Sequence, residues 1–260
     1  MNNISNLAYV HPNAQLGENI TVAPFATIEK DVIIGDNCWI GPNSVLMSGS
    51  RIGHSCKVFP GAVIGADPQD LKYKGEYTTV EIGNHTVIRE CATLHRGTAD
   101  KEKTTVGDHC LIMAYVHLAH DVEVGNNCII ANSAGIAGHA VIQDNVVIEG
   151  GGVSIQQFTI VGQHSFIAGG AMVRKDIPPF IRVARDPLQY VGVNKIGMQR
   201  RGFKEGEIKT VEDIYRLIFV LNKNLSNGIQ AVKDTVPDSK LKDIILEFIA
   251  NSPAGIVKGV

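Results

Sequence analysis

The stretch VGDHCLIMAYVHLAHDVEVGNNCIIANSAGIAGHAVI, residues 106–142, carries a large aliphatic side chain at every sixth position. This period matches neither the 3.6 residues of a helical turn nor the alternation of an ordinary strand. It is the period of a hexapeptide β-helix, in which each repeat is one short strand and one corner. The aliphatic positions here are Val106, Ile112, Leu118, Val124, Ile130, Ile136 and Ile142.

The same period continues on both sides, over residues 10–64, 82–94 and 155–173. A small residue usually stands four positions after each aliphatic one, and glycine is frequent one position after it. We expect the aliphatic and small side chains to point inward, and glycine to relieve the corner through positive φ or close backbone approach. Three hexads close a triangular coil, so the pattern predicts a prism of roughly nine coils.

The hexads stop at Pro178 and Pro179, and the period of the apolar residues then changes. Helical i, i+3, i+4 spacing over residues 208–218 and 241–248 predicts amphipathic helices, the second with Asp238 or Ser239 as a candidate N-cap. The sequence thus predicts an all-β solenoid with an α-helical C-terminus. We place the parallel β-helix at residues 1–186 and the α-helical domain at residues 187–260.

Three irregularities interrupt the repeat. Two polar segments, about residues 67–80 and 96–105, are expected to protrude as loops, and functional residues often lie on such loops of a rigid scaffold. The step from Ile148 to Ile155 is one residue too long and contains three consecutive glycines, at 150–152. A one-residue bulge is the simplest interpretation of that step.

Composition excludes several classes of protein. A net charge of −2 over 260 residues gives no nucleic-acid footprint. No apolar run approaches the ~18 residues of a membrane span, and the polar N-terminus does not resemble a signal peptide, so we expect a soluble cytoplasmic protein. Four cysteines fall on the inward small position and are expected to be buried fillers, namely Cys38, Cys56, Cys110 and Cys128.

Winding the coil brings His120 and Gly138 into register, because each stands two positions after its aliphatic residue. Gln157 takes the same place one coil further on, and Asp121 and His139 stack on the adjacent position. A histidine can remove a hydroxyl proton, an aspartate can fix its tautomer, and a glycine N–H can stabilise an oxyanion. The arrangement favours acyl transfer in which the acceptor hydroxyl is the nucleophile.

A zinc site is the alternative interpretation of these histidines. Imidazoles on neighbouring coils can bind Zn²⁺, here from His117, His120 and His139, as in hexapeptide carbonic anhydrases. Against this, Gly135 stands one coil after His117, where a further ligand would be needed. A non-catalytic scaffold is a third possibility, but it would not require a histidine and an aspartate in register with a glycine.

Residues 174–204 carry eight basic residues against two acidic ones, although the whole chain is slightly acidic. The asymmetry predicts a docking surface for an acidic partner or a phosphorylated ligand.

Over essentially its whole length, the chain resembles the acyl carrier protein-dependent UDP-N-acetylglucosamine O-acyltransferases of lipid A biosynthesis. Many transferases share the hexads, so the specific likeness lies in the histidine motif, both loops and Arg200-Arg201-Gly202-Phe203. The matching segments are residues 69–73, 94–98, 117–121, 137–139, 157–158, 176–179, 192–194 and 200–203.

The resemblance implies a left-handed parallel β-helix and a homotrimer with active sites between subunits. It implies transfer of an (R)-3-hydroxyacyl chain from acyl carrier protein to the glucosamine 3-hydroxyl of UDP-N-acetylglucosamine, without a cofactor or metal. His120 would be the general base, Asp121 its orienting partner and the Gly138 N–H the oxyanion donor.

The resemblance also implies which residues bind the substrates. The acceptor sugar and its phosphates would be held by Gln69, Asp70, Lys72, His117 and His139, with His95 also among the substrate-binding residues. The nucleotide would contact Gln157, Asn194 and Arg201. Arg200 and Arg201 would meet the phosphopantetheine and the acidic carrier protein. Met113 and Gly169 would line the acyl groove.

The chain departs from the family pattern at two positions near the substrates. Gln156 stands where the family commonly has a histidine, and Ile196 where it commonly has a glutamate. A related hexapeptide N-acyltransferase is an alternative, but the hexads begin at Val10, which leaves no separate N-terminal nucleotide-binding domain.

Overall fold

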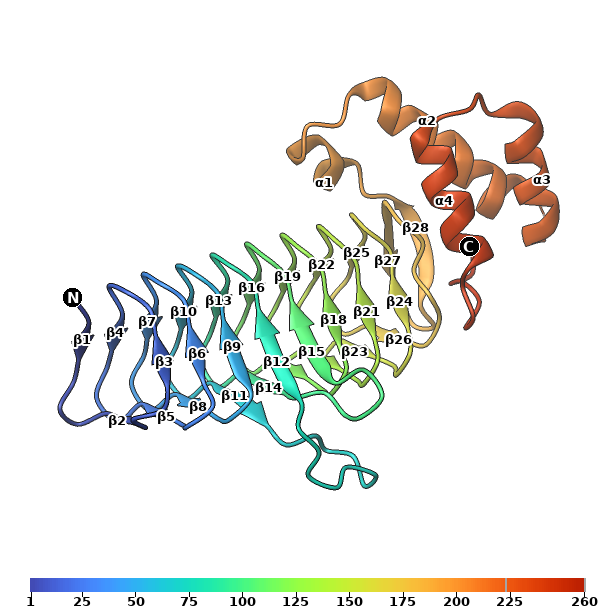
Figure 1. Cartoon of the computed structure of the whole chain (residues 1–260). Helices are drawn as coiled ribbons and strands as arrows, with labels where there is room; N and C mark the ends of the chain where they lie inside the picture. Colours follow the sequence, from blue (N-terminus) through green and yellow to red (C-terminus); the bar gives the residue numbers. More distant parts are fainter. Residues whose placement is uncertain (223, 260) are drawn as a thin grey trace.

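The computed structural model describes residues 1–222 and 224–259. The chain winds into a triangular prism whose three faces are parallel sheets, with the helices gathered at its C-terminal end (Figure 1). Each coil passes in turn through sheet 1, sheet 2 and sheet 3. The predicted solenoid of hexapeptide repeats is confirmed.

Most strands are two residues long, and each pairs with the strand one coil away. Sheet 1 contains β1 (Asn3–Ile4), β4 (Thr21–Val22), β7 (Trp39–Ile40), β10 (Lys57–Val58), β13 (Val87–Ile88), β16 (Leu111–Ile112), β19 (Ile129–Ile130), β22 (Val147–Ile148), β25 (Phe166–Ile167), β27 (Ile181–Ala184) and β28 (Gln189–Val193). Sheet 2 contains β2 (Tyr9–Val10), β5 (Thr27–Ile28), β8 (Val45–Leu46), β11 (Val63–Ala66), β14 (Thr93–His95), β17 (His117–Leu118), β20 (Gly135–Ile136), β23 (Ser154–Ile155) and β26 (Met172–Val173). Sheet 3 contains β3 (Gln15–Leu16), β6 (Ile33–Ile34), β9 (Ser50–Ile52), β12 (Thr79–Ile82), β15 (Lys103–Val106), β18 (Glu123–Val124), β21 (Val141–Ile142) and β24 (Ile160–Val161).

The aliphatic position of the hexad forms the core of the prism. Ile40, Ile112 and Leu118 are fully buried, as is the small residue that ends a corner, such as Ala62. Burial of one such aliphatic side chain contributes about 1.5–3 kcal/mol. Because every coil repeats the same inward positions, the core runs along the whole prism and holds its edges in fixed register.

We call the corners that lead from sheet 3 to sheet 1 the glycine edge, because most of them begin with glycine. A Cβ on Gly125 would lie 2.4 Å from Asp144 Oδ1 and 2.8 Å from Asp144 N, so close approach explains the glycine. Of the two expected reasons for glycine, close backbone approach therefore holds at this edge, and positive φ does not apply there. Left-handed φ occurs two residues later, as at Asn127 (+57°), where asparagine tolerates this conformation.

The cysteines of the glycine edge are buried as predicted, but they are more than fillers. Cys110 Sγ donates to the carbonyl of Gly125 at 3.1 Å, and Cys128 Sγ donates to that of Gln143 at 3.1 Å. Cys38 and Cys56 make the same contact with Gly53 and Gly83. Each thiol therefore donates a hydrogen bond to a backbone carbonyl of the next coil. An apolar side chain at the same position would leave that carbonyl without this donor.

The three irregularities have structural counterparts. Residues 67–78 connect β11 to β12, and residues 96–102 connect β14 to β15; both segments lie between sheets 2 and 3. The residue added between β22 and β23 lies in a corner where Gly151 and Gly152 both have φ of +79°. Ile136 consequently pairs with Ile155, as the predicted register requires.

The prism ends differently from the sequence prediction. β27 adds one more parallel strand beside β25, and β28 then pairs with β27 in antiparallel orientation. β28 thus lies beyond residue 186, on the far side of the expected domain division. Neither strand shows the hexad period, which is why the pattern did not reveal them.

The helices beyond the hairpin are α1 (Lys195–Arg200), α2 (Glu205–Arg216), the π-helical segment η1 (Leu217–Leu221), α3 (Leu225–Thr235) and α4 (Lys240–Ala250). Ser239 Oγ accepts from Lys242 N at the start of α4, so Ser239 is the N-cap. Asp238 instead pairs with the ammonium of Lys242. None of the described helices is both long enough and apolar enough to cross a membrane.

Candidate active site

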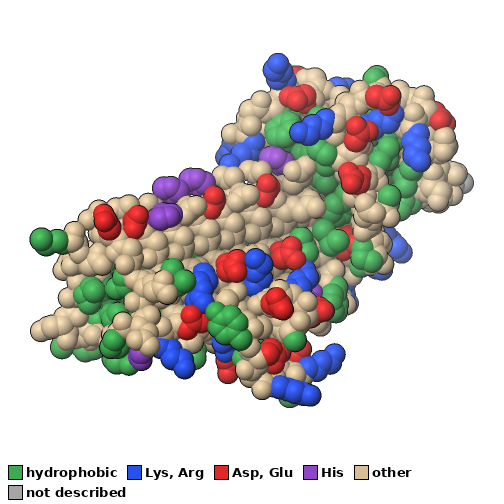
Figure 2. Space-filling view, in the orientation of Figure 1, with side chains coloured by type: hydrophobic (Ala, Val, Ile, Leu, Met, Phe, Trp, Pro, Cys, Tyr) green, Lys and Arg blue, Asp and Glu red, His purple; other side chains and the backbone are tan. Residues whose placement is uncertain are grey.

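Corners that lead from sheet 2 to sheet 3 bring most of the candidate residues together. We call this line of corners the histidine edge. It includes residues 119–122, 137–140 and 156–159, and both long loops leave the prism from it. Figure 2 shows charged side chains gathered over these loops at the lower side of the molecule.

A buried histidine–aspartate pair lies at the centre of this edge. His120 Nδ1 is 2.8 Å from Asp121 Oδ2. His120 is 7% exposed and Asp121 is not exposed at all. An aspartate in this position fixes the imidazole with its proton on Nδ1 and leaves Nε2 able to accept a proton.

Thr98, from the loop 96–102, holds the aspartate. Its N–H donates to Asp121 Oδ1 at 2.8 Å, and its hydroxyl donates to Asp121 Oδ2 at 2.7 Å. Burial by itself would raise the pKa of Asp121, but the hydrogen bonds from His120 and Thr98 hold that pKa below its usual value. The carboxylate is thus kept charged beside His120. Sequence reasoning did not assign Thr98 a role, although it lies in the second loop and in the segment 94–98 that matches the family.

Gly138 lies directly against the imidazole of the next coil. A Cβ on Gly138 would come within 2.6 Å of His120 Cε1 and 2.7 Å of His120 Nε2, so no other residue fits without moving that ring. Among the described residues, no protein group accepts a hydrogen bond from the Gly138 N–H. That N–H is therefore available to a ligand.

His139 lies on the far side of Asp121. Its Nε2 is 3.6 Å from Asp121 Oδ2, and its Nδ1 is 3.3 Å from the carboxylate of Asp100. Phe158 stacks on the His139 ring with 4.6 Å between centroids. His139 is thus held between two carboxylates and one aromatic face.

His95 and His117 form a second pair, with rings in an edge-to-face arrangement 5.0 Å apart. His95 Nδ1 bonds the Asp67 carbonyl at 2.6 Å, and His117 Nδ1 bonds the Thr93 hydroxyl at 2.8 Å. Burial lowers the pKa of both imidazoles below the usual value for histidine. They are therefore neutral hydrogen-bonding groups at neutral pH.

Arg96 ties the two loops together. Its guanidinium pairs with Asp67 and donates to the Tyr73 hydroxyl at 2.9 Å. This contact fixes the base of the loop that carries Gln69, Asp70 and Lys72. Gln69 and Lys72 are exposed, so their side chains are accessible to a ligand.

The alternative zinc site of three histidines is not formed. In the part of the chain that the structure describes, the ligand atoms that all lie within 4.8 Å of one another belong to His120, Asp121 and His139. His117 is not among them and is turned instead towards Thr93.

The remaining candidate residues lie on other edges of the same chain. Arg201 donates to the Asn127 carbonyl at 3.1 Å, and Asn194 donates to the His164 carbonyl at 2.8 Å; both carbonyls belong to the glycine edge. Met113 and Gly169 lie in corners between sheets 1 and 2. Of the predicted nucleotide contacts, one chain brings Gln157 to the edge that holds His120, but not Asn194 or Arg201, and its predicted acyl contacts lie on a third edge. Gln156 lies at the histidine edge, and Ile196 is 61% exposed on α1.

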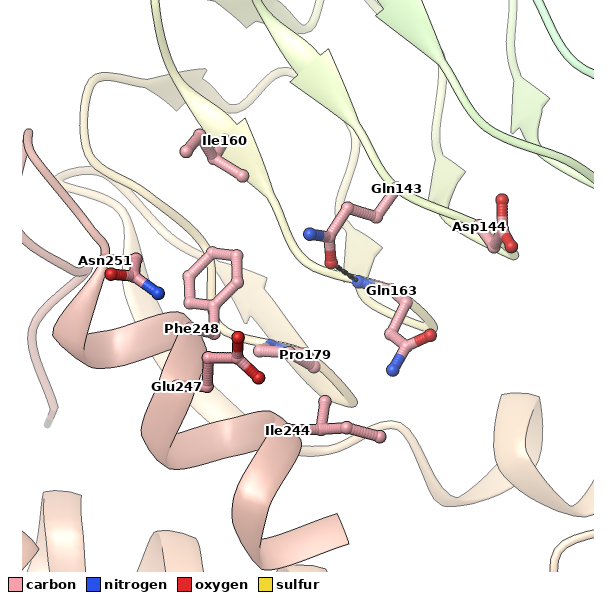
Figure 3. A pocket seen from close by; sticks show the side chains of 9 residues that line it. All are labelled: Gln143, Asp144, Ile160, Gln163, Pro179, Ile244, Glu247, Phe248 and Asn251. Carbon is pink, nitrogen blue, oxygen red and sulfur yellow. Dashed lines mark hydrogen bonds between the residues drawn. The ribbon is translucent and has the colours of Figure 1, made fainter. Parts of the chain in front are cut away.

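Two hollows lie away from the histidines. A cleft of about 510 Å³ separates α4 from the corners that hold Gln143 and Gln163, with Glu247 and Phe248 on the opposite wall (Figure 3). A groove of about 790 Å³ runs between sheet 1 and the helices. Its lining combines apolar side chains with five basic residues and two acidic ones, and it includes Ile129, Val147, Phe166, Arg182, Asn194, Arg200, Glu212 and Asp213.

Two family profiles match the chain. One, described as UDP N-acetylglucosamine O-acyltransferase, domain 2, matches residues 176–257. The other, bacterial transferase hexapeptide, matches residues 31–66 and 103–138.

The chain is also similar to named proteins over nearly its full length. It is 40% identical to an acyl-[acyl-carrier-protein]–UDP-N-acetylglucosamine O-acyltransferase of Pseudomonas putida, with 99% of this chain and 100% of the relative aligned. It is 44% identical to the protein of the same name from Alkalilimnicola ehrlichii, with the same coverage. The crystal structure of a UDP-N-acetylglucosamine acyltransferase from Bacteroides fragilis superimposes with a TM-score of 0.95 at 46% identity, over 98% of this chain and 99% of that one.

Proposed function

The chain belongs to the UDP-N-acetylglucosamine O-acyltransferase family, and from this premise we propose how its residues carry out the reaction. The fold is the left-handed parallel β-helix of that family. The protein is an acyltransferase that moves an (R)-3-hydroxyacyl chain from acyl carrier protein to the glucosamine 3-hydroxyl of UDP-N-acetylglucosamine, the first step of lipid A biosynthesis. The observation that carries the mechanism is the His120–Asp121 pair beside the unoccupied N–H of Gly138.

His120 Nε2 removes the proton of the acceptor 3-hydroxyl as its oxygen attacks the thioester carbonyl. Asp121 stabilises the imidazolium that forms, because its carboxylate lies 2.8 Å from Nδ1. The Gly138 N–H donates to the oxyanion of the tetrahedral intermediate, a contribution of about 3 kcal/mol. The intermediate then collapses, the C–S bond breaks, and His120 returns its proton to the phosphopantetheine thiolate.

The acceptor binds at the histidine edge. Neutral His95 and His117 present hydrogen-bonding groups without adding charge beside the base. The residues proposed to hold the sugar and its phosphates are Gln69, Asp70, Lys72, His95, His117 and His139. Gln157 lies on the same edge, one coil beyond Gly138, and is proposed to contact the nucleotide.

The nucleotide contacts Asn194 and Arg201 come from a second subunit. In one chain they lie on the glycine edge, across sheet 3 from His120. Outward residues in the middle coils of sheet 1 are apolar, for example Val87 and Leu111, whereas sheet 3 carries Glu81 and Glu123 among its outward residues. An extended apolar face favours contact with another copy, and we propose a closed ring of three copies in which one glycine edge lies beside each histidine edge.

The acyl carrier protein docks on the basic C-terminal region. Arg182 and Arg200 line the 790 Å³ groove together with apolar side chains. Basic side chains attract an acidic carrier and its phosphopantetheine phosphate. Met113 and Gly169 are proposed to line the acyl path between sheets 1 and 2.

The donor thioester supplies the activated acyl group, so the proposed reaction uses no cofactor or metal. We place the reaction in the cytoplasm. All five cysteines are free thiols, as is usual in a reducing compartment.

The test is acyl transfer from 3-hydroxyacyl-carrier proteins of several chain lengths to UDP-N-acetylglucosamine. His120→Ala is expected to lower the rate about 10²-fold or more, while binding of UDP-N-acetylglucosamine measured by calorimetry is retained. The chain-length profile reports what the path beside Gly169 admits. An alanine variant with full activity would show that another group is the base.

A further inference from the structure

Two imidazole nitrogens converge on one carboxylate oxygen at the histidine edge, which gives three potential metal ligands. His120 Nδ1 lies 2.8 Å and His139 Nε2 lies 3.6 Å from Asp121 Oδ2. Zn²⁺ binds imidazole nitrogen and carboxylate oxygen at about 2.0–2.2 Å, which puts neighbouring tetrahedral ligands roughly 3.3 Å apart. The two observed separations lie on either side of that value, so small side-chain shifts suffice.

The local charge favours a cation. Asp121 is fully buried. Among the residues that the structure describes, its charged or ionisable side-chain neighbours are only the two imidazoles, and no lysine or arginine pairs with it. Hydrogen bonds from His120 and Thr98 keep Asp121 ionised, so a metal ion would meet a negatively charged oxygen ligand.

His139 is oriented as a ligand. Its Nδ1 lies 3.3 Å from the Asp100 carboxylate but makes no hydrogen bond among the described residues. Its Nε2 faces the Asp121 oxygen across 3.6 Å, so a cation placed between these two atoms could take both as ligands. A carboxylate behind a histidine is the usual outer contact of a zinc ligand.

We propose that His120, Asp121 and His139 form a site for Zn²⁺, and that occupation of this site inhibits the enzyme. Zinc would coordinate Nδ1 of His120, and the ring would carry its one proton on Nε2 instead. Nε2 could then no longer accept the proton of the acceptor hydroxyl. The inhibitory part of this inference rests on the function proposed above; the binding part does not.

The binding test is a Co²⁺ titration of the complete enzyme without substrate, followed by visible absorption and by displacement with Zn²⁺. We expect one Co²⁺ per chain. His139→Gln should weaken binding at least tenfold, and Asp100→Asn, at a side chain that is 70% exposed, should weaken it about tenfold by loss of the outer contact.

The matched control is His85→Asn combined with His109→Asn. These two imidazoles stack with centroids 4.8 Å apart on the glycine edge, so they are the obvious place for adventitious metal. The double variant should bind Co²⁺ as the wild type does. Loss of binding in this control, or equal affinity of wild type and both histidine-edge variants, would overturn the site.

Inhibition is measured separately. Acyl transfer should fall over the same Zn²⁺ concentrations that displace Co²⁺ and recover fully with EDTA. Transfer that persists while zinc occupies the site would contradict the inhibitory role. Metal-free enzyme that transfers no acyl chain would instead count against the proposed function, and the Co²⁺ titration would still decide the site.

Discussion

The histidine edge and the glycine edge are built from the same repeat but use their polar groups differently. At the glycine edge, a side chain of one coil accepts the backbone N–H of the coil before it, as Asp144 does from Asn126 at 2.7 Å. At the histidine edge the corresponding N–H of Gly138 has no protein acceptor among the described residues, and the polar side chains bond one another. The first edge satisfies its own backbone, whereas the second leaves groups available for a substrate. We therefore expect substitutions at the histidine edge to affect mainly activity and substitutions at the glycine edge to affect mainly stability.

The largest effect is expected at the centre of the histidine edge. Asp121→Asn removes the charge that orients His120 and stabilises the imidazolium, so kcat should fall about 10³-fold. The KM for UDP-N-acetylglucosamine should change little, because Asp121 is buried behind the base. Steady-state kinetics check this, and a variant with normal kcat would mean that His120 needs no orienting carboxylate.

A pair of glycine substitutions compares the two edges directly. The Cβ in Gly138→Ala meets the His120 ring at 2.6 Å, so activity should fall about 10²-fold through a displaced base. The Cβ in Gly125→Ala meets Asp144 instead, at 2.4 Å, and should destabilise the fold by about 2 kcal/mol with normal kcat. Steady-state kinetics and denaturant unfolding of both variants measure the two effects. If Gly125→Ala is the less active of the two, the proposed difference between the edges is wrong.

The stability of the glycine edge should depend on pH through His164. Burial, with the nearby Arg201, lowers the pKa of His164 to about 4, whereas an unfolded histidine titrates near 6.5. As pH falls from about 6.5 to about 4, the unfolded chain binds a proton that the folded chain does not, so stability falls, by about 2 kcal/mol. His164→Gln should remove this part of the stability that is lost at acidic pH. Urea unfolding at fixed chain concentration, at neutral pH and near pH 4.5, measures the free energy of unfolding of both proteins. Equal losses in the wild type and in His164→Gln would show that His164 is not the group responsible.

The smallest predicted effect concerns the loop that holds the aspartate. Thr98→Val removes the hydroxyl that donates to Asp121 Oδ2 and keeps the backbone donor, so kcat should fall about tenfold. Thr98→Ser keeps the hydroxyl and should restore most of the rate. If the serine variant is as slow as the valine variant, the side chain acts through packing rather than through its hydrogen bond.

The regular parts of the molecule were predictable because repetition fixes register. Period six placed His120 over Gly138 and Asp121 beside His139, and the structure has both neighbours. Thr98 was not predictable, because it reaches Asp121 from a loop that carries no period. The hairpin of β27 and β28 was not predicted for the same reason, because neither strand follows the hexad period. For the corner glycines the sequence left positive φ and close backbone approach open, and at the glycine edge the structure shows close approach, with positive φ two residues later.

The sequence pattern also did not show that the predicted site residues would lie on different edges of the prism. Asn194 and Arg201 follow the hexads by many residues, and only the folded chain shows them against the glycine edge. The basic excess of residues 174–204 was visible from composition, but not which coils it would overlie.

Mixed oligomers test the central claim, that His120 of one copy works with Arg201 of the next. His120→Ala and Arg201→Ala should each lose about 10²-fold of acyl-transfer activity alone. Random co-assembly of equal amounts should restore about a quarter of the wild-type activity, because a site that takes one intact half from each of two subunits then forms with that frequency. Mixtures that stay at the average of the two separate variants would show that each chain forms its active site alone, and would contradict the account.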